Sequence, residues 1–517
     1  MKIGIDMLGD QSAGRTRGVG RCTRGLVSRL IADTQHEFVL YYHRGLPRSA
    51  NGFWQAKTVA SSSMSVGNAL RGVPRPASDV APPIDGTARA PLPTEVAPPT
   101  NGTPNPFPTE TRRCEIRQIG TPGASLHLAS EPLVQSNPDR LDVLLLTCPL
   151  ENFQGYLPPF PVGGRMKLAA IVYDLVPLIF PDDYLHHPAI AQAYRRALCA
   201  LRQYDVLLTI SEASRQDMQQ RLGLRGDRVV NVSAGSDEAR FSPAANDAER
   251  QADAARLNDL GVREPFLYGQ TALDARKNLP GLLAAAECLP AGLREKHQIV
   301  LSCAAGGPDD VEQVRSLIAR SSVAGHALLL EQVDDAALRA LYRRSAAFVF
   351  PSRYEGFGLP LLEAMQCGAA VVAGNNSSQV EVVGEAGLLA DVDCPGELAA
   401  CIARILTDQP LAERLRERAL RQARLFSWSA TARRCDAALN AARLAPPAAH
   451  WLGVWGARAR LAISERMTRM PHFAWRPDAR PWRAGQLCSN TAPCLPGSTP
   501  RRPSRNASES VPQRDQE

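Results

Sequence analysis

The chain has 517 residues, of which 44% are hydrophobic and 21% are charged, as in ordinary globular proteins. These proportions exclude a fully disordered chain, a collagen-like fibre and a small disulfide-stabilised scaffold. The formal net charge of +7 is concentrated in residues 445–517, which contain eleven arginines and five acidic residues. The remainder is nearly neutral, which argues against a body that binds nucleic acid.

Cysteine usage and targeting signals indicate the compartment. The twelve cysteines form no CxxC pair and have no spacing typical of a zinc site. No secretory signal precedes the first expected strand, and the longest apolar run, 168–180, is interrupted by Asp174 and Pro177. We therefore expect reduced thiols, no membrane-spanning helix and a cytoplasmic location.

Strand-like runs alternate with amphipathic helical stretches along most of the chain. In the first half we expect a helix at 18–33 and strands at 2–6, 37–42, 141–147, 167–173, 205–210 and 228–232. In the second half we expect strands at 265–269, 297–303, 326–330, 346–351 and 369–374, with helices at 280–293, 309–322, 334–344 and 395–407. This alternation predicts an α/β protein whose parallel sheets are covered on both faces.

The polar stretch 242–258 separates the two series of strands and predicts a linker. We therefore expect two doubly wound, Rossmann-like domains that face each other across a cleft, an N-terminal one at 1–241 and a C-terminal one at 259–430. In such sheets ligands bind beyond the carboxyl ends of the strands.

Two segments fall outside this pattern. Residues 74–108 contain eleven prolines and predict a disordered insertion in the first domain. Residues 431–517 predict a C-terminal helix followed by a basic, disordered tail. Within this tail, 451–470 has the pattern of a basic amphipathic helix that rests on an anionic membrane surface, although a short helix packed on the body explains the same pattern.

The sequence AFVFPSRYEGFGLPLLEAMQCG at 347–368 predicts a buried strand, a loop with Gly356 and Gly358, and a helix with a proline in its first turn. The N–H groups and dipole at the start of this helix suit a phosphate. Carboxylates repel a diphosphate, so we expect Glu355 and Glu363 to accept hydrogen bonds from hydroxyls of a sugar and a ribose. The alternatives are a solvated loop acid and an acid that complements the helix dipole.

Two adjacent cations, Arg276 and Lys277, follow a strand and precede a helix in PFLYGQTALDARKNL. Cations at the start of a helix oppose its dipole unless an anion offsets them, so this placement favours binding of a diphosphate. A solvated basic pair is the alternative. Gly18 and Gly20 in RGVGRCTR permit a close approach of ligand to backbone, although a tight strand-to-helix turn without ligand is the more common explanation of such a pattern.

Three aspartates complete the candidates. Asp174 ends an inner strand of the first domain and should face the cleft across from Glu355, with a capping or loop role as the alternative. Asp391 and Asp393 form a DxD, but no third ligand is near them in the sequence, so we expect a surface turn and no metal site.

With these motifs in order, the chain resembles the retaining glycosyltransferases of family 4, which have the GT-B fold. EGFGLPLLEAM resembles the E-x7-E signature of that family, VVGEAGLLADVD the segment after it, and DARKN its diphosphate loop. YDLVPLIFPDDYL, ISEASRQDM and GVGRCTRGLV are similar to the first-domain motifs of its mannosyltransferase-like branch. The resemblance covers roughly 1–50 and 141–427.

The resemblance implies that the N-terminal domain binds the acceptor and the C-terminal domain the nucleotide-sugar. It also implies a role for each matching residue. Arg276 and Lys277 would bind the donor diphosphate, Glu355 the hydroxyls of the transferred sugar, and Glu363 the nucleotide ribose. We take as catalytic candidates Glu355, Lys277, Arg276 and Asp174. We take as candidates for binding the donor nucleotide Glu363, Gly356, Phe357, Gly358, Leu359, Gly18 and Gly20, of which the last two would border the acceptor and phosphate region.

Two departures from the family pattern affect these roles. Tyr173 stands where many relatives have histidine, so a role of that imidazole in orienting sugar is absent or taken over by the phenol. Thr271 and Ala272 stand near a place where relatives tend to have a glycine pair. Their side chains would restrict the approach of the diphosphate to the backbone and lower activity.

The sequence therefore predicts a retaining hexosyltransferase that needs no metal or cofactor and uses a nucleoside-diphosphate sugar, with GDP-mannose as the first choice. The acceptor would be a glycan or lipid-linked glycan in bacterial polysaccharide or lipopolysaccharide synthesis, with peripheral contact to the inner face of the cytoplasmic membrane left open. One alternative is a nucleotide-sugar epimerase. The other is a catalytically degenerate relative that acts as a partner in a polysaccharide assembly complex.

Overall fold

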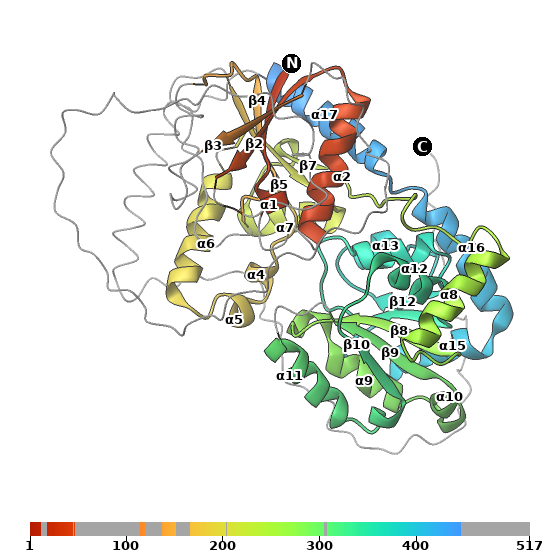
Figure 1. The fold of residues 1–517 in the computed structure, drawn as a ribbon. Helices are drawn as coiled ribbons and strands as arrows, with labels where there is room; N and C mark the ends of the chain where they lie inside the picture. Colours follow the sequence, from red (N-terminus) through yellow and green to blue (C-terminus); the bar gives the residue numbers. More distant parts are fainter. Residues whose placement is uncertain are drawn as a thin grey trace, which may run out of the picture. The chain divides into compact units, whose positions relative to one another are not determined.

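The computed structural model describes residues 1–11, 18–44, 46, 114–119, 137–150, 166–202, 204–303 and 308–445 (Figure 1). All of them belong to one compact unit, Met1–Val454. The proline-rich stretch 74–108 and the tail from residue 446 onward lie outside the described residues. The predictions for those two segments therefore stay predictions.

The first sheet consists of seven parallel strands in the order β3-β2-β1-β4-β5-β6-β7. Its strands are β1 (Lys2–Asp6), β2 (Glu37–His43), β3 (Cys114–Ile119), β4 (Val143–Leu146), β5 (Lys167–Val172), β6 (Val206–Thr209) and β7 (Val229–Asn231). The helices along this part are α1 (Leu8–Gln11), α2 (Gly18–Asp33), α4 (Val176–Ile179), α5 (Pro181–Tyr184), α6 (Pro188–Leu201) and α7 (Glu212–Leu222). Its inner strands β4, β5 and β6 are buried throughout, as expected for a sheet covered on both faces.

The second sheet consists of six parallel strands in the order β10-β9-β8-β11-β12-β13. Its strands are β8 (Phe266–Thr271), β9 (Gln298–Cys303), β10 (Ala327–Leu330), β11 (Ala347–Phe350), β12 (Val371–Gly374) and β13 (Leu388–Ala390). The helices are α8 (Asp247–Asp259), α9 (Leu279–Glu287), α10 (Ala291–Lys296), α11 (Pro308–Ala319), α12 (Asp335–Arg344), α13 (Leu359–Gln366), α14 (Gln379–Val383), α15 (Pro395–Thr407) and α16 (Gln409–Ala423).

Two expected elements differ in the structure. The single helix expected at 280–293 is divided into α9 and α10, because Pro290 lacks the N–H that would continue the helix and instead precedes α10. Most of the predicted linker 242–258 is the helix α8, which packs against α12. Its polar composition reflects a largely exposed helix whose charged side chains pair with α12, among them Asp253, whose Oδ2 accepts from Arg343 Nη1 at 3.1 Å.

The last described helix returns to the first sheet. α17 (Trp428–Leu444, blue in Figure 1) follows all the strands of the second sheet in the sequence, yet it packs against α2 (red) and contacts β5 and β6. Gly25 makes this packing close, since a Cβ there would lie 2.3 Å from the indole of Trp428. None of the helices in the described part of the chain is both long and apolar enough to cross a membrane.

Candidate active site

The candidate residues follow the carboxyl ends of parallel strands. In the second sheet β8 and β11 are hydrogen-bonded neighbours, so the loops after them emerge side by side. The loop after β8 carries Arg276 and Lys277, and the loop after β11 carries Glu355. The pairing of β8 with β11 thus brings together two motifs that are almost eighty positions apart in the sequence.

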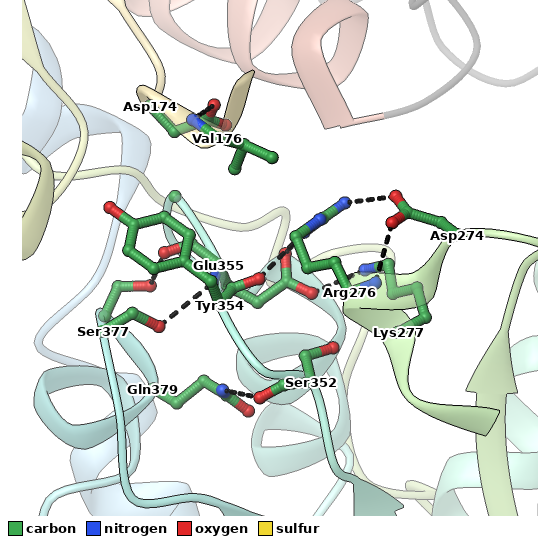
Figure 2. Close-up of polar contacts among 12 residues, drawn as sticks. Asp174, Val176, Asp274, Arg276, Lys277, Ser352, Tyr354, Glu355, Ser377 and Gln379 are labelled. Carbon is green, nitrogen blue, oxygen red and sulfur yellow. Dashed lines mark hydrogen bonds and ion pairs between the residues drawn. The ribbon is translucent and has the colours of Figure 1, made fainter. Parts of the chain in front are cut away.

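Glu355 is the centre of this cluster, as Figure 2 shows. Its Oε2 accepts a hydrogen bond from Arg276 Nη1 and its Oε1 one from Lys277 Nζ, both at 2.6 Å. Glu355 is only 7% exposed. Its backbone is fixed as well, because its N–H donates to Ser377 Oγ at 3.0 Å and its carbonyl accepts from Ser378 Oγ at 2.9 Å.

The two cations control the charge of this carboxylate. Burial alone would raise the pKa of Glu355, but Arg276 and Lys277 outweigh burial and lower that pKa to about 2. Burial lowers the pKa of Lys277, and Glu355 offsets only part of that effect. Glu355 is therefore ionised at neutral pH and acts only as a hydrogen-bond acceptor.

Arg276 has further partners that fix its plane. Its Nη2 lies 3.2 Å from Asp274 Oδ2, and its Nη1 also donates to the Tyr354 carbonyl at 3.1 Å. The phenol of Tyr184 in α5 donates to Asp274 Oδ1 at 2.7 Å. Tyr184, from the part of the chain that forms the first sheet, thus supports Arg276 in the part that forms the second sheet.

Asp174, two residues after the end of β5, lies next to the Glu355 loop. A Cβ at Gly356 would fall 3.0 Å from Asp174 Oδ2, while Asp174 Oδ1 accepts the N–H of Val176 at 3.0 Å (Figure 2). Burial raises the pKa of Asp174, and Arg276 opposes this. The hydroxyl of Ser214 lies 2.8 Å from the Tyr173 carbonyl oxygen and 3.3 Å from that of Gly356, which fastens the two loops together.

The helix after the Glu355 loop starts as the sequence predicts. Gly358 has φ +97° and precedes α13 without a side-chain cap. Pro360 has no N–H and the Leu361 N–H bonds the Gly358 carbonyl at 2.9 Å, so the Leu359 N–H is the first-turn donor left for an anion. The side chains of Phe357 and Leu359 are buried in the hydrophobic core, and Phe357 packs edge-on against Phe426. A bound nucleotide-sugar would therefore contact these two residues through their backbone.

Glu363, within α13, forms an ion pair that the sequence motifs did not predict. Its Oε1 accepts from Nη1 of Arg21 in the first turn of α2, and its Oε2 lies 3.4 Å from the Tyr342 hydroxyl. Gly18 begins α2 and faces Leu359, since a Cβ at Gly18 would lie 3.9 Å from that side chain. A signal for Arg21 was present, because a cation in the first turn of a helix opposes the dipole unless an anion offsets it.

The structure shows the surroundings of Tyr173 and Thr271, the residues that depart from the family pattern. The Tyr173 hydroxyl lies 3.1 Å from Thr23 Oγ1 and 3.5 Å from the Val19 carbonyl oxygen, so it contacts the first turns of α2. Thr271 ends β8, is buried, and its Oγ1 has no hydrogen-bond partner among the described residues. The Tyr173 phenol therefore fills a position beside the glycine-containing start of α2.

The DxD residues lie in the turn after β13. Asp391 Oδ1 accepts the N–H of Asp393 at 3.0 Å, and Asp393 pairs with Arg353 at 2.8 Å. Both carboxylates thus have protein partners at this turn.

Comparison with known proteins places this geometry in a family. Residues 260–422 match the family model described as glycosyl transferases group 1. The chain is 33% identical over 286 residues to O-antigen chain mannosyltransferase B of Escherichia coli, and the match covers 54% of this chain and 72% of that relative. The chain belongs to the group 1 glycosyltransferases.

This group 1 glycosyltransferase is also 31% identical over 268 residues to the serotype-specific mannosyltransferase WbdA of Escherichia coli, over 52% of its own length. It spans only 32% of the length of WbdA. The solved structure of Alr3699/HepE from Anabaena, in complex with UDP and glucose, matches 85% of this chain and all of its own with a TM-score of 0.57 at 18% identity. The predicted fold class, GT-B with two Rossmann-like domains, is confirmed.

Proposed function

We propose that this group 1 glycosyltransferase transfers mannose from GDP-mannose, with retention and without a metal, to a hydroxyl of a glycan or lipid-linked glycan in cell-surface polysaccharide or lipopolysaccharide synthesis. The observation that carries the proposal is the buried Glu355 carboxylate held between Arg276 and Lys277. Two relatives named as mannosyltransferases in Escherichia coli support the choice of sugar and pathway.

The cation pair suits the diphosphate of a donor. Lys277 has three N–H donors, of which one is directed to Glu355, and Arg276 Nε is buried without a partner among the described residues. Both groups therefore have donors left for phosphate oxygens. As the bond from the sugar to the diphosphate breaks, these cations and the start of α13 stabilise the charge that develops on the leaving group.

Glu355 suits the hydroxyls of the transferred sugar. Each of its carboxylate oxygens uses one acceptor site for a cation, so each keeps a further site for a hydroxyl. Because its pKa is about 2, the carboxylate stays ionised and accepts strong, charge-assisted hydrogen bonds. Two adjacent hydroxyls of a hexose would fit these two acceptors.

The chemistry then needs no covalent intermediate with the enzyme. In the step we propose, the acceptor oxygen attacks the anomeric carbon on the face from which the diphosphate leaves, and an oxygen of that diphosphate takes the acceptor proton. One C–O bond breaks and one forms, and the configuration is retained. Asp174 borders the Glu355 loop at Gly356, where it would position sugar or acceptor.

The test is product formation from labelled GDP-mannose with cell-wall glycan fragments, comparing wild type, Lys277→Ala and the matched control Lys296→Ala, whose lysine is exposed in α10. Loss of one diphosphate cation should reduce turnover by roughly 10²- to 10³-fold, while K296A should match wild type. The anomeric configuration of the first product, read by NMR, tests retention. Undiminished turnover by K277A would overturn the assigned role of the cation pair.

A thermal-shift series with GDP, UDP, ADP and their sugars identifies the donor class, since a ligand that binds only the folded state raises the melting temperature. We expect a shift with GDP and GDP-mannose that EDTA leaves unchanged. A shift lost in EDTA would contradict metal independence. The rival interpretation, a degenerate partner protein, is favoured by the buried Thr271 at the end of β8 and would show no shift with any nucleotide.

A further inference from the structure

Arg21 is a charged residue at the site to which the proposed function assigns no role. It lies in the first turn of α2, four positions before Gly25, and its Nη1 pairs with Glu363 of α13. The side chain of Glu363 is 3% exposed and that of Arg21 is 25% exposed. The carboxylate is thus almost buried, while part of the Arg21 side chain remains exposed.

The pair leaves Glu363 with acceptor sites for a ribose. Arg21 uses one site on Oε1, and the Tyr342 hydroxyl, 3.4 Å from Oε2, uses at most one site there. A carboxylate has about four such sites, so two remain, one on each oxygen. Two adjacent hydroxyls of a ribose need this arrangement of acceptors.

The guanidinium also keeps a free edge. Arg21 Nε is buried and has no hydrogen-bond partner among the described residues, and the bond to Glu363 comes from Nη1. The edge formed by Nε and Nη2 is the one that binds two oxygens of a phosphate side by side. Its neighbours on α2 differ, since Arg24 pairs with the buried Asp10 and Arg29 lies near Asp33 on the exposed side.

We propose that Arg21 is a donor-binding residue: its Nε edge binds a phosphate of the nucleoside diphosphate while its Nη1 holds Glu363 in position for the ribose. This inference rests on the proposed function. It makes the donor site composite, because α2 belongs to the first-sheet part of the chain while Glu363 and Lys277 belong to the second. One planar side chain then links recognition of the ribose to recognition of the phosphates.

The experiment compares wild type with Arg21→Lys, which keeps a cation beside Glu363 but lacks the Nε edge. Arg29→Lys, an exposed arginine two turns further along α2, is the matched control. Dissociation constants are measured for GDP and guanosine, with UDP and uridine in parallel, by calorimetry. Circular dichroism and the melting temperature report folding of each variant.

We expect R21K to weaken GDP binding by about tenfold or more and guanosine binding by less than about threefold, as for loss of one bidentate phosphate contact, and R29K to match wild type. Equal losses of affinity for GDP and guanosine would show that Arg21 only positions Glu363. Unchanged affinity for both would show that Arg21 does not contribute to donor binding. Both results overturn the proposal.

Failure of the proposed function gives a different result. Wild-type protein would then bind neither GDP nor UDP, whereas a wrong role for Arg21 leaves wild-type binding intact. If R21K does not fold, the double variant Arg21→Gln/Glu363→Gln removes both charges of the pair. Loss of the ribose contacts should weaken GDP and guanosine equally in that variant, so any additional loss for GDP still measures the phosphate contact.

Discussion

Gly356 lies so close to Tyr173 that a Cβ atom at position 356 would fall 2.7 Å from the Tyr173 carbonyl oxygen. A backbone oxygen cannot move aside as a flexible side chain can. The absence of a side chain at Gly356 therefore lets the Glu355 loop approach the end of β5. Gly356 has no positive φ among the described backbone angles, so this requirement is one of space alone.

Gly356→Ala should consequently separate the two loops. We expect turnover to fall by at least about tenfold, because a displacement near 1 Å at a reacting centre costs roughly that much or more. The control is Gly292→Ala in α10, where a Cβ would meet no atom within 4 Å. G292A should retain wild-type turnover and a melting temperature at or above wild type, since alanine favours a helix. Wild-type turnover in G356A would contradict the steric argument.

Glu355→Gln should change how stability depends on pH. In the folded protein the pKa of Glu355 is about 2, below its ordinary value of 4.5. The ionised carboxylate therefore stabilises the fold fully above pH 4.5, and this contribution is lost as the pH falls toward 2. We expect the difference in unfolding free energy between wild type and E355Q to reach the order of 3 kcal/mol near pH 7 and to shrink in acid.

Urea unfolding at several pH values measures this difference. Glu295→Gln, at an exposed position of α10, provides the control and should give a small difference at every pH. A difference for E355Q that grows as the pH falls would show that Glu355 does not carry its charge into the folded state as described.

Tyr184→Phe should weaken donor binding more than it weakens the fold. It removes the 2.7 Å hydrogen bond from α5 to Asp274, which holds the plane of Arg276. We expect the unfolding free energy to fall by about 0.5–1.5 kcal/mol and the donor KM to rise several-fold with little change in kcat. Tyr41→Phe removes a similar tyrosine–aspartate bond, to Asp139, and should lower stability without changing KM.

Glu381→Gln tests a contact between α14 and α7. The two oxygens of Glu381 accept the backbone N–H groups of Glu212 and Ala213 at 3.0 and 3.1 Å, at the start of α7. Because an amide offers only one acceptor oxygen and no charge, E381Q should lower the unfolding free energy by roughly 1 kcal/mol. Glu385→Gln, at an exposed neighbouring position, should be neutral. Equal melting temperatures of the two variants would show that this contact is dispensable.

Much of the fold could be predicted from local sequence. Apolar runs separated by helical stretches indicated most strands of both sheets, because each buried strand needs a continuous apolar stretch. β3 was missed, since its residues, CEIRQI, alternate with polar ones and leave it only half-buried at the edge of the sheet. Polar composition also concealed α8, whose helical pattern shows only Asp253 and Leu257 as buried positions.

Local sequence was enough to select the candidate site residues, because motifs such as DARKN and EGFGLPLLEAM hold cations, carboxylates and a helix start at fixed spacing. The partners of these residues depend on how the chain folds. The neighbouring positions of β8 and β11 join Glu355 to Lys277, and the packing of α2 near α13 joins Arg21 to Glu363. Ion pairs between distant segments depend on strand order and helix packing, and neither can be predicted from the spacing of residues along the chain.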